Sequence, residues 1–593
     1  MIKLFLSISV CVALTSSLFS APLANYIKSD VQAFVSIRNL AETQAQWESH
    51  PFAELLDDES MKSVIEALSG SGSASAENDA EGFVEVMQNE FGLSMDEFLN
   101  LFNGEIALSF YNLADQFGAA EAPRRMALMA HFSGDEDRIE ELMQIQFERN
   151  AKAHKEVNPL VEHVWVEETF MGEVLYMDET FNGVDTYIED GYALVDGVFV
   201  LATEDELRQI VEWIKEGGDS IASSESYQRA IEDAGRGDLR FYANLSAIVK
   251  PLNEALMAKV MQGGLAMFGV TAQSLDAALD LEALQACVLD VDLTEKGLLL
   301  SSGVFYREKS GLLRLLHYVE GALPEASYVP EAVLATSVST FDFSAMFAEL
   351  EKVLGLASPS VPMLLDIQFQ KIKTDTGVDL RASILENISG DFVSLSMMRE
   401  QSRETEVSLS EQLYVMGVKD TQSLSDAMET LKDLVPGARD LIETQEYEGQ
   451  TIHTIKSQRN PMQPNVPVND VSFVITRSEL ILNIGRVGLL QEVLSRMVDT
   501  KRGFWQLDET ERIVDSIAAE NAVSRSYVDF SQMAKPVLQS LLMAATAGGL
   551  DTEVDFSQLS ADLEIPLIMI SESNEADDGL LVRALLLKKE DAE

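Results

Sequence analysis

Short apolar runs alternate along the chain with segments of helical spacing. Residues 31–37 and 333–338 are β-like runs, and each leads into a segment whose large apolar residues recur at roughly helical intervals. In the first such segment these residues are Trp47, Phe52, Leu55 and Leu56, and in the second they are Met346, Phe347, Leu350, Val353 and Leu354. Glycine-punctuated strands are predicted next, at 104–110 and 390–397, followed by strands at 126–132 and 413–418. Acidic residues then start a helix, at Asp135–Asp137 and at Asp420.

Turn signals between apolar runs predict hairpins. Asp196-Gly197 separates the runs 192–195 and 198–201, and an Asp-Gly pair between such runs is a strong hairpin signal. Turns at 295–297 and 577–579 separate the last two apolar runs of each half. Consecutive hairpins with inserted helices predict a mainly antiparallel sheet, and therefore an α+β fold.

The second half of the chain repeats the pattern of the first. The segment from Arg240 to Pro251 (RFYANLSAIVKP) aligns with the segment from Arg525 to Pro536 (RSYVDFSQMAKP), 285 residues later, and the alignment continues without a gap to Gly263 and Gly548. Further blocks match in the same order. We therefore expect two tandem copies of one α+β unit, at 22–310 and 311–593. The shared Lys250-Pro251 and Lys535-Pro536 pairs are interpreted as helix starts.

The first twenty residues have the pattern of a secretory signal peptide. Lys3 precedes an apolar run from Leu4 to Leu14, and small residues follow as far as Ala21. The run is shorter than the roughly 20 residues that span a bilayer, which disfavours a membrane anchor. A lipid-attachment signal at Cys11 is rejected because Val10 precedes it. The pattern predicts a signal peptide over 1–20 and a periplasmic or extracellular protein of bacterial type.

The net charge of the chain disfavours some classes of binding partner. The 593 residues include 98 acidic and 43 basic side chains, a net charge of −55, which repels nucleic acid and anionic membrane surfaces. The acids are spread along the chain, which favours a role in solubility over cation binding. The most apolar later segments, 252–270 and 537–550, are short or carry charge, so no integral membrane segment is expected after signal cleavage. Cys287, the one cysteine left, is expected to be a buried, inert thiol.

Motifs for chemistry are lacking in the sequence. The six histidines (50, 131, 154, 163, 317 and 453) include no pair at metal-ligand spacing, and His453 takes the place of Tyr176 in the repeat, which indicates a packing position. There is no nucleophile elbow, phosphate loop or dinucleotide fingerprint, and Asp290-Val-Asp292 lacks the remainder of a calcium loop. We therefore predict no catalytic, cofactor-binding or metal-binding residues and no cofactor. Asn244 and Asn387 begin glycosylation sequons, which matter only in a eukaryotic secretory pathway.

Two short segments resemble a known family. Asp30 to Ile37 (DVQAFVSI), followed by His50 to Leu56 (HPFAELL), is similar to an uncharacterised exported family common in planctomycetes and verrucomicrobia. The element at Tyr447-Glu-Gly449 is also similar, although Phe170 replaces the tyrosine in the first copy. The resemblance implies an exported, duplicated α+β protein and carries no activity or site.

These observations favour a non-enzymatic binding or structural protein of the cell envelope or extracellular space. A carrier for a lipid or other apolar ligand is an alternative, because the segments 252–268 and 536–550 are apolar and contain methionine. A carboxylate-based glycan hydrolase is a second alternative, although no pair among so many acids stands out.

Overall fold

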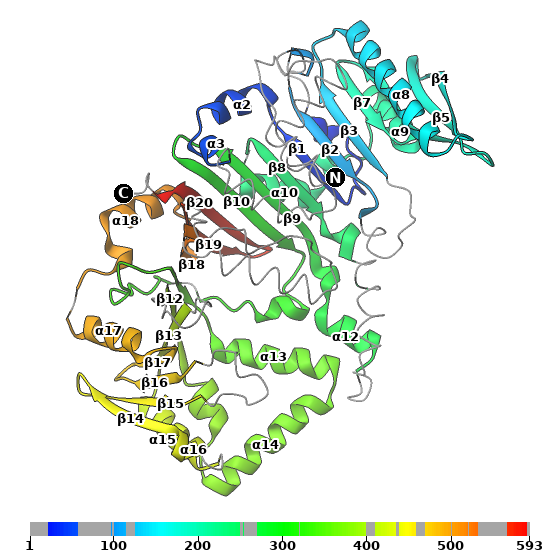
Figure 1. Cartoon of the computed structure of the whole chain (residues 1–593). Helices are drawn as coiled ribbons and strands as arrows, with labels where there is room; N and C mark the ends of the chain where they lie inside the picture. Colours follow the sequence, from blue (N-terminus) through cyan, green and yellow to red (C-terminus); the bar gives the residue numbers. More distant parts are fainter. Residues whose placement is uncertain are drawn as a thin grey trace. The chain divides into compact units, whose positions relative to one another are not determined.

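The described part of the chain forms two compact units (Figure 1). The computed structural model describes residues 22–56, 97, 100–102, 104–113, 125–235, 237–249, 253, 270–319, 321–398, 410–434, 438–457, 469–499, 501–519, 521–531 and 566–589. Within these ranges the first unit consists of 22–253 and 284–307, and the second of 270–283, 308–531 and 566–589.

The first unit contains a ten-stranded sheet in which every neighbouring pair is antiparallel. Its spatial order is β4-β5-β6-β7-β3-β2-β1-β8-β9-β10. The strands are β1 (Ala33–Ile37), β2 (Ile106–Phe110), β3 (Met126–His131), β4 (Glu162–Phe170), β5 (Glu173–Phe181), β6 (Thr186–Val195), β7 (Val198–Ala202), β8 (Leu239–Asn244), β9 (Leu284–Leu293) and β10 (Gly297–Tyr306).

The hairpin predicted at Asp196-Gly197 is confirmed. It joins β6 to β7, and both turn residues have positive φ, 48° and 83°. Two successive positive φ values match the right-handed twist of the flanking strands, and Asp and Gly tolerate them. The turn between β4 and β5 uses the same conformation at Met171-Gly172, with φ values of 52° and 90°.

Helices of the first unit pack apolar stripes against its sheet. They are α2 (Leu40–Glu48), α3 (Pro51–Leu56), α8 (Glu136–Val157), α9 (Glu204–Glu216) and α10 (Glu225–Ala234), with the short 3-10 helices η1 (Leu23–Asn25) and η3 (Ile221–Ser223). The carboxylate of Asp135 accepts from the amide of Arg138, which confirms the predicted acidic start of α8.

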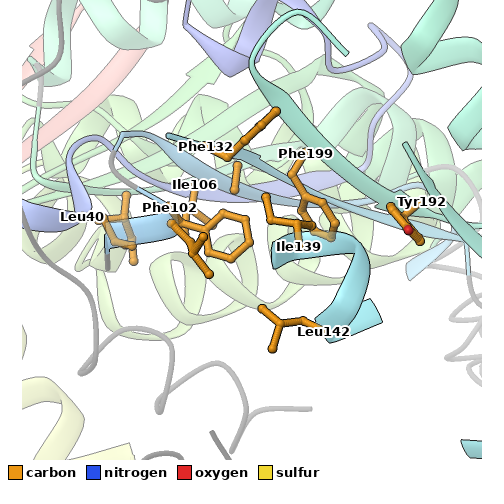
Figure 2. Packing of buried hydrophobic residues seen from close by; sticks show 11 residues of the cluster. Leu40, Phe102, Ile106, Phe132, Ile139, Leu142, Tyr192 and Phe199 are labelled. Carbon is orange, nitrogen blue, oxygen red and sulfur yellow. The ribbon is translucent and has the colours of Figure 1, made fainter. Parts of the chain in front are cut away.

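Figure 2 shows the buried apolar cluster between α8 and the sheet of the first unit. Ile139 of α8 lies close to the rings of Phe102 and Phe199, whose centroids are 5.5 Å apart, and Leu142 belongs to the same cluster. Tyr192 continues the same cluster along β6 and is 1% exposed. The apolar contact between helix and sheet holds α8 in place, and with it the side chains near its end.

The second unit contains a ten-stranded antiparallel sheet with the order β14-β15-β16-β17-β13-β12-β11-β18-β19-β20. Each strand takes the place of the strand with the corresponding rank in the first unit. The strands are β11 (Ala335–Thr340), β12 (Ile388–Met398), β13 (Ser410–Val418), β14 (Ile442–Tyr447), β15 (Gln450–Ile455), β16 (Val471–Ile475), β17 (Glu479–Ile484), β18 (Ala522–Asp529), β19 (Leu567–Ala576) and β20 (Gly579–Lys588).

The helices of the second unit include a hairpin formed by α13, which contacts β12, and α14, which packs on α13 (Figure 1). None of the residues of α14 is buried. The helices are α12 (Ala272–Leu279), α13 (Phe343–Ala357), α14 (Ser360–Thr376), α15 (Thr421–Leu434), α16 (Ala438–Leu441), α17 (Val487–Val498) and α18 (Asp508–Ile517). Short helical turns are η5 (Leu281–Ala283), η6 (Gly311–Leu315), the π-helical η7 (Arg381–Leu385) and η8 (Phe504–Gln506).

The α+β class and the mainly antiparallel sheet are confirmed. One detail differs from expectation, because Cys287 on β9 is partly exposed, not buried. Burial of its surroundings still raises the pKa of the thiol, which disfavours the reactive thiolate. No helix within the described ranges has both the length and the apolar character needed to cross a membrane. Three predictions lie outside the described residues: the signal peptide at 1–20, the apolar segments 252–268 (apart from residue 253) and 536–550, and the two Lys-Pro pairs.

Candidate functional site

An ion pair between a partly exposed arginine and a buried carboxylate forms the floor of the candidate site in the second unit. Arg525 on β18 lies directly across from Glu572 on β19. The Arg525 Nε donates to Glu572 Oε1 over 2.8 Å, and Nη2 lies 2.7 Å from the same oxygen. The other oxygen, Oε2, accepts from the amide of Ala519 at 2.9 Å. Glu572 is 2% exposed, so these hydrogen bonds replace the water that its charge would otherwise require.

Trp505 packs beside this ion pair. The Arg525 guanidinium lies over the indole ring, 5.8 Å from its centroid, a cation–π arrangement. Trp505 is 6% exposed, and its Nε1 has no hydrogen-bond partner among the described atoms. A buried N–H without a partner costs free energy. Because the Trp505 Nε1 atom has almost no solvent-accessible surface, an acceptor forms a hydrogen bond with it only after a small shift of the side chains that cover it.

The turn η8 holds Trp505 in this position. Gly503 precedes η8, and a side chain on Gly503 would overlap the carbonyl of Ser327, so only glycine lets the two segments approach. The Gly503 amide donates to Gln506 Oε1 at 3.0 Å, and the Gln506 side-chain amide donates to the carbonyl of Glu325 at 2.5 Å. The Gln506 side chain therefore links the turn that carries Trp505 to the loop at Glu325.

These groups line an open pocket of about 770 Å³. This volume lies within the range of about 300–1,000 Å³ that is usual for small-molecule sites. Its walls come from the loop 321–325, from η8, from α18 and the residues after it, and from β18 and β19. The lining residues are Gly321, Leu323, Pro324, Glu325, Trp505, Gln506, Glu511, Val514, Asp515, Ala518, Ala519, Asn521, Ala522, Arg525 and Glu572.

The charge around the pocket is acidic. Arg525 and Glu572 compensate each other at the floor, whereas Glu325, Glu511 and Asp515 are exposed at the walls. Three exposed carboxylates disfavour an anion and accept hydrogen bonds from hydroxyl or ammonium groups. The pocket thus offers acceptors at its rim, and one covered indole donor belongs to its lining residues. This combination suits a ligand that both donates and accepts hydrogen bonds.

The corresponding position of the first unit has the ion pair without the tryptophan. Arg240 on β8 lies across from Asp290 on β9, and its Nε donates to Asp290 Oδ1 at 2.7 Å. Nη2 donates to the carbonyl of Gly235 at 2.6 Å. The short helix at the corresponding place, η3, reads Ile-Ala-Ser and carries no aromatic side chain. The two units therefore share the ion pair, and the indole donor belongs to the second unit.

Glu105 lies near the ion pair of the first unit. Its carboxylate accepts from the amide of Leu23 at 2.8 Å. Burial raises the pKa of Glu105 to about 7, opposed by the Leu23 hydrogen bond and by the charge of Arg240. A carboxyl group that titrates near neutral pH is a recognised feature of functional sites, and it also occurs where a sheet buries an acid.

A second pocket of about 650 Å³ lies at the strands β14 to β17 and the start of α17. Lys456 on its wall pairs with Asp470 at 3.0 Å and with Glu443 at 3.4 Å. Thr454 shares a hydrogen bond of 2.9 Å with Ser472. The lining of this pocket includes no buried side-chain donor or acceptor without a partner, so it makes a weaker case for a ligand than the Trp505 pocket.

Two of the six histidines lie next to each other in the structure, although the sequence predicts scattered positions. His154 Nδ1 lies 3.0 Å from His163 Nε2, because the end of α8 folds back on β4. His453 stacks on Phe473 at 5.0 Å, as Tyr176 stacks on Tyr192 at 4.8 Å, which confirms its interpretation as a packing position. Within the described residues, no group of three or more His, Cys, Asp or Glu side chains is arranged to hold a metal ion.

Other positions considered from the sequence have structural roles. Asn387 is 5% exposed and donates to the carbonyls of Ser383 and Asp420, so its sequon is inaccessible in the folded protein. Asp290 belongs to the ion pair with Arg240. Arg240 and Arg525 align in the sequence, but their partner carboxylates lie 50 and 47 residues further along the chain, too far for a local pattern to indicate them.

The comparisons with known proteins do not assign this chain to a family. No protein-family model matches the chain, and no curated protein matches it. Similar solved structures are three crystal forms of TP0453. Form III is 7% identical and covers 49% of this chain and 80% of its own, with a TM-score of 0.22. Forms I and IV are 10% and 11% identical, each covers 46% of this chain and 96% of its own, and their TM-scores are 0.19 and 0.21.

Proposed function

We propose that this chain is an exported, non-enzymatic binding protein whose second unit holds a neutral, hydroxyl-rich ligand, such as a short saccharide, in the Trp505 pocket. The observation that carries the proposal is the buried indole N–H without a partner on the lining of an open 770 Å³ pocket. Hydroxyl groups both donate and accept, so they match the carboxylates at the rim and the indole donor among the lining residues.

The other ligand classes fit this pocket less well. An anion would face three exposed carboxylates, and a purely cationic ligand would leave the Trp505 donor unpaired. An apolar ligand would bury the carboxylates of Glu511 and Asp515 without compensation. The proposal of an apolar carrier rested on segments outside the described residues, and the Trp505 pocket adds no support to it.

We also propose that the two units are tandem copies of one ancestral unit and that residues 1–20 are removed on export. The duplication is supported by the shared strand order, by the sequence alignment at an offset of 285, and by the ion pairs of Arg240 and Arg525. Export is supported by the signal-peptide pattern. Amino-terminal sequencing of the protein from a cell fraction outside the cytoplasm tests cleavage after Ser20 or Ala21, and an uncleaved terminus contradicts it.

Ligand binding is measured by tryptophan fluorescence and by isothermal titration calorimetry. The purified chain lacking residues 1–20 is titrated with glucose, N-acetylglucosamine, maltose and cellobiose, and separately with glucuronate, spermidine and a lysine-rich peptide. We expect at least one neutral sugar to bind, and Trp505→Phe, which keeps the ring and removes the donor, to weaken binding about tenfold.

Trp213→Phe in the first unit is the matched control and is expected to leave binding unchanged. The ligand class is wrong if only glucuronate, spermidine or the peptide binds, or if Trp505→Phe binds the sugars as the wild type does. Release of a shortened product from any of the sugars contradicts the non-enzymatic part of the proposal and favours a glycan hydrolase.

A further inference from the structure

The first unit contains a pair of imidazoles that face each other nitrogen to nitrogen. His154 lies in the last turn of α8, and His163 lies on β4, nine residues later. His154 Nδ1 and His163 Nε2 are 3.0 Å apart. His154 is exposed, whereas the side chain of His163 is 1% exposed, so the pair connects solvent with the interior of the unit.

A carboxylate fixes the orientation and the tautomer of His163. Its Nδ1 lies 2.9 Å and 3.0 Å from the two oxygens of Asp178 on β5, whose side chain is 8% exposed. A carboxylate only accepts, so Nδ1 carries the hydrogen and Nε2 presents its lone pair toward His154. Thr180 adds a contact of 3.0 Å to the same nitrogen, and the Phe147 ring meets the imidazole edge to face at 6.4 Å.

From this geometry we infer that His154 Nδ1 and His163 Nε2 are ligands of a divalent transition-metal ion of the imidazole-preferring kind, such as Cu²⁺ or Zn²⁺. A histidine that donates its other N–H to a carboxylate is the usual state of a metal-bound histidine, because the carboxylate raises the basicity of the ligating nitrogen. His163 and Asp178 have this arrangement, and it places the free lone pair toward the second imidazole.

The separation of the two nitrogens suits one shared ion. Two donors at about 2.0–2.1 Å from one metal lie about 3 Å apart when the angle between them is about 95°, which falls between tetragonal and tetrahedral geometry. His154 is also in the last turn of α8, where the helix dipole favours a cation. Water completes the coordination, since the described residues supply these two imidazoles and no third ligand.

Binding requires one rearrangement of a proton. In the metal-free protein the His154 Nδ1–H donates to His163 Nε2. The ion binds to one side of the line that joins the two nitrogens, and the proton of His154 then resides on its Nε2. Both imidazoles stay neutral in this exchange. Because His154 is exposed, solvent can carry out this exchange, and the His154 ring can turn to direct its lone pair at the ion while Asp178 keeps its hydrogen bond to His163.

Titration of the chain lacking residues 1–20 with Cu²⁺ tests the inference. We expect one equivalent to bind with two nitrogen ligands in the electron paramagnetic resonance spectrum and to quench Trp165, which lies two residues from His163 on β4. His154→Ala and His163→Ala are each expected to weaken this equivalent at least about 30-fold, and Asp178→Asn about 10-fold to 100-fold. Zn²⁺ is expected to compete for the same equivalent.

His453→Ala is the matched control, because His453 lies on a hairpin strand of the second unit and contacts a lysine instead of a second histidine. It is expected to bind Cu²⁺ like the wild type. His154 is exposed, so His154→Ala keeps the fold and decides the outcome even if His163→Ala is unstable. Affinity of His154→Ala within about threefold of the wild type, or a spectrum with fewer than two nitrogens, overturns the inference.

Discussion

Arg525 and Glu572 face each other on neighbouring strands, and the guanidinium Nε donates to the buried carboxylate over 2.8 Å. The same relationship joins Arg240 and Asp290 in the first unit. A buried ion pair adds little net stability compared with apolar residues, but each partner depends on the other, because a buried charge without a partner is costly.

Removing one member of the pair is therefore expected to be far worse than removing both. We predict that Arg525→Leu lowers the free energy of unfolding by about 3–5 kcal/mol and that the Arg525→Leu/Glu572→Leu double variant regains most of this loss. Urea denaturation of the four proteins of the double-mutant cycle measures the coupling. The exposed pair Arg502–Asp508 is the control, and Arg502→Ala should cost less than about 1 kcal/mol. Additive losses in the cycle would contradict the prediction.

Replacing the indole of Trp505 by a phenyl ring is expected to change the free energy of unfolding very little. Its Nε1 is buried without a partner, so Trp505→Phe removes an unsatisfied donor along with part of a packed ring. We predict a change in the free energy of unfolding within about 1 kcal/mol of zero in the ligand-free protein, in contrast to the several kcal/mol that truncation of a packed aromatic costs. Trp505→Ala, measured by the same denaturation, should cost about 3–5 kcal/mol. A loss from Trp505→Phe as large as that from Trp505→Ala would show that the indole nitrogen is satisfied.

The raised pKa of Glu105 predicts a pH dependence of stability. The carboxyl titrates near pH 7 in the folded protein and near 4.5 when unfolded, so between these values the native state binds more protons. The free energy of unfolding therefore falls as pH rises from about 4.5 to about 7 and is constant above that, for this group. Glu105→Gln, which keeps the acceptor for the Leu23 amide, should raise stability at pH 8 by on the order of 2 kcal/mol.

Denaturation of the wild type and of Glu105→Gln at pH 5 and pH 8 measures this difference. Glu295→Gln, at an exposed turn of the same unit, is the control and should leave the pH dependence unchanged. An equal stability difference between wild type and Glu105→Gln at both pH values would contradict the assignment.

Two glycines with open space around them should respond in opposite directions to alanine. Gly197 has a φ of 83°, and nothing lies within 4 Å of an added Cβ, so Gly197→Ala carries backbone strain alone and should cost about 1–2 kcal/mol. Gly488 lies in α17, also with nothing within 4 Å, so Gly488→Ala should stabilise by up to about 1 kcal/mol. Thermal or urea denaturation of each variant checks the sign, and a destabilising Gly488→Ala would indicate a contact that alanine disturbs.

Local pattern was sufficient for much of the fold. The positive-φ pair at Asp196-Gly197 follows from the residues themselves, and the Asp135 start of α8 follows from the preference of helix N-termini for acids. Alternation of apolar residues located the strands closely enough to predict an antiparallel sheet. Cys287 was the exception, because its neighbours in sequence are apolar while its exposure depends on what covers β9.

The residues of the two candidate sites could not be predicted from local sequence patterns. Glu572 is one of 98 acids, and only the register of β18 against β19 singles it out as the partner of Arg525. His154 and His163 belong to elements of different periodicity, and their meeting depends on how α8 returns to β4.

The sequence by itself determined the α+β class, the hairpins and the alignment of Arg240 with Arg525, because these depend on periodicity and on turn chemistry over a few residues. The tertiary structure alone decided which carboxylate each arginine meets, that Trp505 lines a pocket with an unpartnered donor, and that two histidines face each other. Such contacts join residues distant in sequence, and they are set by strand register and by helix packing, which no local pattern encodes.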